Sequence, residues 1–198
     1  MNLDNIYGIN IKAGNHKLGI DTAIINMGAA IDCPSKRKKL CQLSDNVKCY
    51  ALKAEKLYPS VINYRRKQAK YWLQNTTSNI LSDIYEFIKR KTYPIKYLRF
   101  NESGDFYNQK DVDKLSQIAI SLNYRGIITY GYTARSDLYY NKIHFLLKGS
   151  GFFAPNGKTT VIKKVEDLPD NFYLCGNDCR VCTLCKDKNN INIAFKYH

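Results

Sequence analysis

Residues 95–135 read IKYLRFNESGDFYNQKDVDKLSQIAISLNYRGIITYGYTAR, and this stretch decides the fold. The apolar runs 95–101 and 126–134 each indicate a strand. Between them, apolar residues recur every three or four positions, which is typical of an amphipathic helix. The apolar face of this helix comprises Val112, Leu115, Ile118, Ala119 and Leu122. A strand, a helix and a second strand in this order predict a βαβ unit with parallel strands.

Helical patterns continue upstream of this unit. The first predicted helix begins near Cys49 and ends before Tyr58, and a second covers 60–75, because Pro59 suits a first helical position. In the second helix one stripe holds Val61, Tyr64 and Gln68, and the basic residues, Arg65 among them, are expected mostly on the opposite face. A third, amphipathic helix is predicted over 76–91, with Thr77 or Ser78 as its N-cap.

Downstream, strands are expected within 144–153, 159–169 and 172–175, after a short helical turn at 136–142. The predicted fold is α/β: a partial (βα) barrel or a curved, mainly parallel sheet with a C-terminal cysteine-rich metal-binding segment. The chain of 198 residues suits a single domain. Within it we distinguish an N-terminal segment 1–49, a βα core 50–170 and a C-terminal segment 171–198.

Seven cysteines fall into two groups. The first group has the spacing C-x7-C-x7-C and comprises Cys33, Cys41 and Cys49. The second has the spacing C-x3-C-x2-C-x2-C and comprises Cys175, Cys179, Cys182 and Cys185. An odd count and the lack of a secretion signal argue against disulfides. Zinc remains an alternative, but the compressed C-terminal spacing favours an iron–sulfur cluster over the two separated knuckles that one zinc ion usually takes.

The N-terminal trio has no histidine at ligand spacing. Three thiolates leave one position of a metal site open, and an open position can take a substrate or cofactor. Alternatively, a C-terminal cysteine completes this site, or the two groups form one split structural site that joins the ends of the chain.

Polar residues follow the two central strands, where parallel sheets place their ligands. The first group directly follows Phe100 and comprises Asn101, Glu102, Ser103, Gly104 and Asp105. Helix capping is an alternative role for such residues, although capping needs only one of them. After the second strand, Arg135 could bind a carboxylate or phosphate through two hydrogen bonds.

Several of these short motifs resemble one family. They are Cys49-Tyr50-Ala51, Tyr58-Pro59-Ser60-Val61, the Arg65/Arg66 pair, Ser103-Gly104-Asp105-Phe106-Tyr107, Tyr132-Thr133-Ala134-Arg135 and the cysteine-rich C-terminal segment. Together they look like the phage "gene product eighty-eight"-type proteins, which in turn resemble distant relatives of the radical S-adenosylmethionine (SAM) superfamily.

The resemblance implies a partial (βα) barrel in which Cys33, Cys41 and Cys49 hold a 4Fe–4S cluster whose fourth iron binds SAM. Tyr50 then stands beside the last ligand, and the strand-end residues 101–105 contact SAM. The four C-terminal cysteines would hold a second cluster. This chain departs from the superfamily in the wide spacing of its trio and in lacking a glycine pair in the strand-end group 101–105.

Charge suggests a partner. The formal net charge is +14, with basic runs at 36–39, 65–70 and 89–91, and 16 tyrosines. Basic and aromatic residues together favour looped or single-stranded nucleic acid. No run is long and apolar enough to cross a membrane, and the N-terminus does not resemble a secretion signal, so a cytoplasmic protein is expected.

We therefore expect an iron–sulfur protein of radical-SAM-like architecture that modifies nucleic acid or a nucleotide. The alternatives are a non-enzymatic nucleic-acid-binding protein held by zinc or inert clusters, and an electron-transfer or redox-sensing module.

Overall fold

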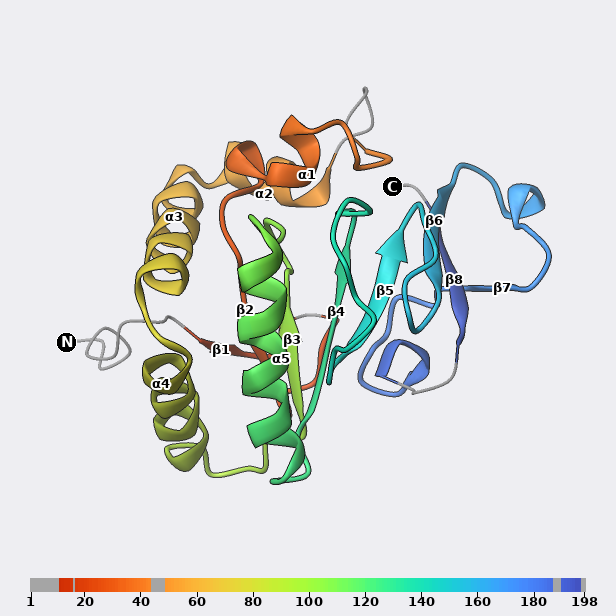
Figure 1. The fold of residues 1–198 in the computed structure, drawn as a ribbon. Helices are drawn as coiled ribbons and strands as arrows, with labels where there is room; N and C mark the ends of the chain where they lie inside the picture. The colour runs from red at the N-terminus through yellow and green to blue at the C-terminus, as the bar shows by residue number, and fades with distance from the viewer. Residues whose placement is uncertain (1–10, 16, 44–48, 187–189, 197–198) are drawn as a thin grey trace.

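A single twisted sheet runs through the computed structural model, which describes residues 11–15, 17–43, 49–186 and 190–196 (Figure 1). Its eight strands, among these residues, lie in the order β1-β2-β3-β4-β5-β6-β8-β7. All neighbours pair in parallel except the edge strand β1, which is antiparallel to β2. The strands are β1 (Lys12–Ala13), β2 (Thr22–Ile25), β3 (Tyr97–Phe100), β4 (Ile128–Thr133), β5 (Leu146–Ser150), β6 (Lys158–Ile162), β7 (Phe172–Leu174) and β8 (Asn192–Lys196).

The helices are unevenly distributed around this sheet. The three long helices cover one face, and the two short helices lie at the carboxyl ends of the parallel strands, at the top of Figure 1. They are α1 (Pro34–Arg37), α2 (Tyr50–Leu57), α3 (Pro59–Gln74), α4 (Thr77–Lys89) and α5 (Gln109–Asn123), with 3-10 turns at Ala30–Asp32, Val165–Asp167 and Leu184–Lys186. The predicted curved, mainly parallel sheet is confirmed, and it does not close into a barrel.

The hydrophobic core lies between the sheet and the long helices. Leu98 and Phe100 of β3 are buried there, and the Phe100 ring meets the Phe145 ring edge-on, with centroids 5.1 Å apart. All five apolar residues predicted for the face of α5 are buried in this core. Because side chains alternate along a strand, Tyr97 and Arg99 point to the other face of the sheet. That face carries the candidate site.

Two details of the helices differ from prediction. The N-cap of α4 is Thr76, not Thr77 or Ser78, because the Thr76 hydroxyl accepts the Asn79 N–H at 3.2 Å. Arg65 of α3 is buried, not on a solvated face. Its Nη1 donates to Glu55 Oε1 at 2.8 Å, which ties α3 to α2 through an ion pair.

Other differences concern the second half of the chain. Residues 136–142 form turns without a helix. The strand expected within 159–169 ends at Ile162, where the 3-10 turn follows. Strand β8 was not predicted. Among the described residues, no helix has the length and apolarity that crossing a bilayer requires.

Candidate metal centre

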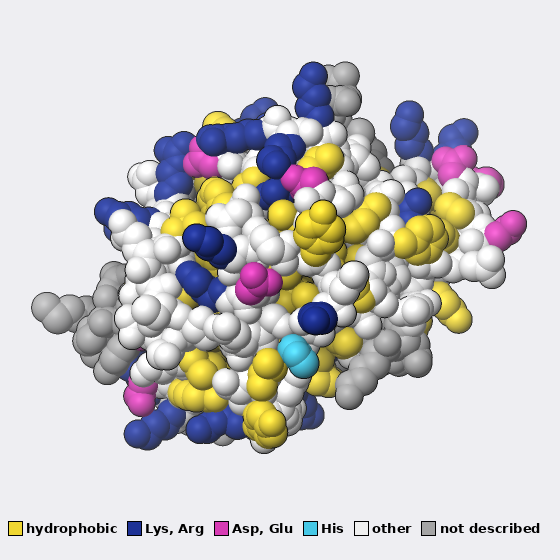
Figure 2. Space-filling model, in the orientation of Figure 1, with side chains coloured by type: hydrophobic (Ala, Val, Ile, Leu, Met, Phe, Trp, Pro, Cys, Tyr) yellow, Lys and Arg dark blue, Asp and Glu magenta, His cyan; other side chains and the backbone are white. Residues whose placement is uncertain are grey.

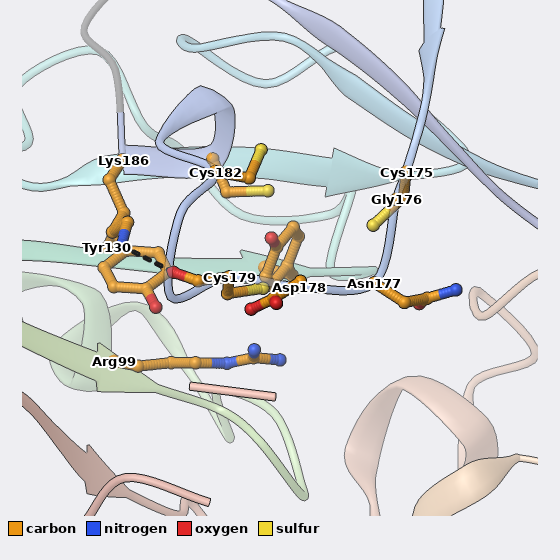
Figure 3. Close-up of a pocket in the computed structure, with 11 residues that line it drawn as sticks. Arg99, Tyr130, Cys175, Gly176, Asn177, Asp178, Cys179, Cys182 and Lys186 are labelled. Carbon is orange, nitrogen blue, oxygen red and sulfur yellow. Dashed lines mark hydrogen bonds between the residues drawn. The ribbon is translucent and has the colours of Figure 1, made fainter. Parts of the chain in front are cut away.

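The connection between β7 and β8 carries the four C-terminal cysteines, and all four line one pocket (Figure 3). The opposite wall comes from the sheet face that the helices leave uncovered: Arg99 of β3 with Tyr130 and Tyr132 of β4. The space between the lining atoms, counting the open mouth, is about 350 Å³. The structure therefore brings thiols from one short segment against a basic and aromatic wall that lies far away in sequence.

Backbone hydrogen bonds hold the cysteine segment in this position. Cys175 N donates to Ala194 O of β8 at 2.8 Å, and Cys179 N donates to Lys17 O at 3.0 Å. Lys186 Nζ donates to Cys179 O at 3.1 Å, which is the dashed line in Figure 3. The turn after β1 and the last strand thus fix the two ends of the segment.

Burial favours the protonated form of two of these thiols, Cys179 and Cys185. It raises the pKa of Cys185 to about 11, against a hydrogen bond from Tyr132 that lowers it. Burial also raises the pKa of Cys179, and the charge of Arg99 opposes that shift. Metal binding must therefore release protons here, which makes metal affinity depend on pH.

The N-terminal trio lies at another place, over the carboxyl ends of the strands. Cys33 precedes α1 and Cys49 precedes α2, so both stand at helix N-termini. Cys41 Sγ accepts the Leu43 N–H at 3.4 Å. Burial first, and then the nearby Asp105 carboxylate, raise the pKa of Cys33 to about 12. None of these three cysteines lines the C-terminal pocket.

Side chains of the segment 35–42 attach it to the turn after β3 and to the strands β5 and β6. Ser35 Oγ donates to Asp105 Oδ2 at 2.5 Å, and Gln42 Nε2 donates to Ser150 Oγ at 3.0 Å and to Thr159 O at 3.3 Å. These contacts run from the end of β3 across to β5 and β6. The segment 33–43, which carries Cys33 and Cys41 and is called the trio loop below, is consequently held against the sheet by side-chain hydrogen bonds.

Asp105 is the centre of the strand-end group. Its carboxylate accepts hydrogen bonds from Thr133 Oγ1 at 2.7 Å and from the Ala134 and Phe106 N–H groups at 2.9 Å each, besides that of Ser35. The side chain is buried. Asp105 therefore joins β3, β4 and the trio loop.

Its neighbours in the group are less fully bonded. The Tyr50 hydroxyl donates to the Glu102 carbonyl, and Glu102 Oε1 accepts a hydrogen bond from Asn15 at 2.7 Å. Within the described part of the chain, buried Asn101 Oδ1 and Ser103 Oγ have no hydrogen-bond partner. Such buried polar atoms ordinarily have one, so they mark a place where a ligand can bind.

Gly104 has a backbone that only glycine adopts readily here. Its φ is +78°, and a Cβ would stand 2.6 Å from Gly28 N and 2.8 Å from Met27 C. The strand-end turn of β3 therefore lies directly against the segment that follows β2, where the trio loop starts.

Arg135 is engaged inside the protein. It is 2% exposed, and its Nε and Nη2 donate to the two oxygens of Asp137 at 2.6 and 3.0 Å. Its Nη1 donates to the carbonyls of Phe106 and Tyr107. Asp137 occupies the two paired donors of the guanidinium that an external carboxylate or phosphate would bind.

The four thiols of the C-terminal pocket have the type and number of the ligands of an iron–sulfur cluster or of a zinc site. Among the described residues, no three His, Cys, Asp or Glu side chains are placed to hold one ion. A zinc ion needs four sulfurs about 2.3 Å from one point, whereas a 4Fe–4S cluster binds each thiolate on a different iron. Among the described residues, the thiols of the pocket are thus not arranged around a single point.

Sequence reasoning missed the basic side of this pocket. Arg99 and Lys186 both line it, and neither was predicted as a site residue. The available signal was an arginine inside the apolar strand YLRF. Alternation predicts its face, but which segment covers that face depends on the turn at Lys17 and on β8.

Comparison with known families agrees with the motifs. The model of the family described as gene product 88 matches residues 9–197. The chain belongs to the gene product 88 family. Comparisons with curated proteins and with solved structures find no match. In this member of the gene product 88 family, the trio lies at the carboxyl edge of the sheet, and the other four cysteines line a pocket on the face opposite the long helices.

Proposed function

We propose that this chain is an iron–sulfur protein with two separate cysteine sites. The observation that carries the proposal is the placement of Cys175, Cys179, Cys182 and Cys185 around one pocket on the sheet. Four half-buried thiols around one pocket have no packing role that requires four cysteines, and thiolates are the ligands of iron–sulfur clusters. The N-terminal trio supplies the second site.

The N-terminal site is proposed to bind a cluster with one open iron, and SAM as its ligand. Three thiols stand at the carboxyl edge after β2, the first parallel strand. The turn that follows β3, the second, leaves Asn101 Oδ1 and Ser103 Oγ buried without partners at the same edge. These atoms could accept or donate hydrogen bonds to a polar ligand. A cluster of this kind supplies one-electron reduction to a bound sulfonium.

Nucleic acid is the proposed partner. The formal net charge of +14 supports it, and Figure 2 shows Lys and Arg side chains spread over the visible face. A field of that sign attracts polyanions of any sequence. A substrate carried on nucleic acid would then reach the carboxyl edge of the sheet, where parallel sheets bind ligands.

Metal and sulfide analysis of protein purified without oxygen tests the iron proposal. Two clusters predict about eight iron atoms and as many sulfides per chain. Cys182→Ser should remove about half of the iron, and Cys49→Ser should remove the other half. If Cys182→Ser and Cys49→Ser each remove all of the iron, the two cysteine groups form one split site. Zinc without sulfide would overturn the iron proposal.

SAM binding is tested on the same material. SAM should perturb the spectrum of the cluster that Cys49→Ser removes, and should leave the spectrum of the Cys182-dependent cluster unchanged. Iron that is present but insensitive to SAM would contradict the enzyme and favour an electron-transfer or redox-sensing role.

A further inference from the structure

The C-terminal cysteine pocket contains two buried cations that lack a carboxylate partner. Arg99 Nε is buried and has no hydrogen-bond partner among the described residues. Lys186 is 8% exposed, and its Nζ bonds the Cys179 carbonyl. Within the described ranges, neither side chain forms an ion pair with Asp or Glu. Among the described residues, neither cation therefore has a carboxylate in contact with it, and the charge of Glu102 acts on Arg99 only from a greater distance.

The other buried arginines of the described residues, Arg65 and Arg135, each form an ion pair with a carboxylate. Arg65 is paired with Glu55 at 2.8 Å, and Arg135 is paired with Asp137 at 2.6 Å. Asp178 also lines the cysteine pocket, but its carboxylate is bound by the exposed Arg180 at 2.7 Å. Of Arg65, Arg99 and Arg135, only Arg99, in the pocket of the four thiols, thus has no carboxylate of the described residues in contact with it.

Contacts with aromatic rings offset only part of the free-energy cost of burying these two cations. Arg99 lies over the Tyr132 ring at 5.2 Å, and Lys186 lies over the Tyr97 ring at 4.2 Å. Such contacts contribute about 0.5–2 kcal/mol each, whereas an isolated buried charge costs considerably more. An arginine does not escape this cost by losing its proton. The pocket therefore requires negative charge from another source.

The thiols can supply that charge. Four thiolates around a cluster core leave a net charge of roughly −2, which matches the two cations of the pocket. In Figure 3 the Arg99 side chain extends beside Cys179 and Asp178, and Lys186 reaches toward the same segment from the other end. Anion and cations would lie in one partly buried pocket, where solvent screens their attraction less than at the open surface.

We propose that Arg99 and Lys186 are the resident counter-charges of the C-terminal cluster and that they raise its reduction potential. The inference rests on the proposed function. Its physical reason is that reduction adds an electron to an already negative site, and a nearby cation stabilises the reduced state more than the oxidised state. The two residues are positioning residues for the cluster and do not ligate it.

Redox titration of the full chain, loaded with iron without oxygen, tests the proposal by absorbance and electron paramagnetic resonance. The C-terminal signal is the one lost in Cys182→Ser. Arg99→Gln and Lys186→Met should each move the midpoint of that signal to a more negative potential. Arg99→Lys keeps the charge and should move it less. Arg66→Gln is the matched control, because this exposed arginine of α3 is also paired with a carboxylate, Asp32, but neither residue lines the pocket, and it should leave the midpoint unchanged.

The outcomes separate the two proposals. Iron-loaded Arg99→Gln and Lys186→Met with the wild-type midpoint would overturn the counter-charge inference and leave the cluster standing. If both neutral variants lose the C-terminal iron, the iron content of Arg99→Lys decides. Retention of iron there supports the inference. Loss of iron there overturns it, because the pocket would then need the shape of the arginine and not its charge. A wild-type chain without iron overturns the proposed function itself.

Discussion

Single carboxylates decide much of the local geometry near the candidate site. Asp137 binds the buried guanidinium of Arg135 through both oxygens and also accepts Lys38 Nζ at 2.7 Å. The hydrogen bond from Arg135, followed by that from Lys38, holds the pKa of Asp137 well below its ordinary value. This pairing keeps Arg135 in place against the backbone carbonyls that follow β3.

We expect Asp137→Asn to lower the free energy of unfolding by about 2 kcal/mol, because it leaves the Arg135 charge buried without its partner. The folded-state pKa of Asp137 is depressed, so its contribution is present above the ordinary value near pH 4 and is lost as the pH falls below it. Urea unfolding at pH 7 and pH 3 measures the effect, which should shrink at pH 3. Asp178→Asn, at an exposed pair, should leave the unfolding midpoint unchanged, and an equal loss in both variants would contradict the argument.

The Cys33 thiol gives a second test at this scale. Its pKa near 12 predicts that only about one molecule in ten thousand is a thiolate at pH 8. In the metal-free native chain, the rate of Cys33 alkylation by iodoacetamide should keep rising through pH 10. In urea the same rate should level off near pH 9. Peptide mass spectrometry measures both, and a native plateau near pH 9 would show that burial does not hold this proton.

Among the elements, the turn after β3 is the one on which the candidate site depends most. Gly104 packs against the backbone of Met27 and Gly28, and Asp105 next to it ties β4 to the trio loop. A displacement of this turn would move Asn101 and Ser103, whose buried oxygens lack partners among the described residues, and also the N-terminal cysteines.

Gly104 and Gly126, which have nearly the same φ angle, distinguish the cost of backbone strain from the cost of a steric clash. Gly104 has φ +78° and Gly126 has φ +72°, but a Cβ at Gly126 meets nothing within 4 Å. Gly126→Ala should therefore cost about 1 kcal/mol of stability from backbone strain alone. Gly104→Ala should cost clearly more, and it should also weaken iron retention at the N-terminal site. Thermal unfolding and iron content measure these effects, and equal losses would show that the close approach at Gly104 is unimportant.

For the whole molecule, net charge is the property that most affects binding to a large partner. A charge of +14 on 198 residues predicts binding to nucleic acid that is governed by counterion release. Affinity for a single-stranded RNA should fall at least about tenfold between ~50 and ~200 mM salt, and log affinity should be linear in log salt concentration. Fluorescence anisotropy measures this dependence. Affinity that is absent at low salt, or insensitive to salt, would contradict a nucleic-acid partner.

The sequence alone determined the long helices and the strands β3 and β4, because these follow from local periodicity, but it did not reveal β8. The apolar face of α5 and the start of α3 at Pro59 are as predicted. The polar group after β3 and the two cysteine groups were also visible as residue patterns. The parallel arrangement followed from the alternation of strands and helices.

Only the tertiary structure decided how these pieces meet. Whether the cysteine groups form one site or two depends on the path of the chain, and Cys179 is held by Lys17, far away in sequence. Pairing likewise decided the roles of three arginines: Arg65 and Arg135 each have a carboxylate, whereas Arg99 faces thiols. Local patterns cannot reveal such choices, because the free energy of a buried charge depends on whichever groups the rest of the fold places beside it.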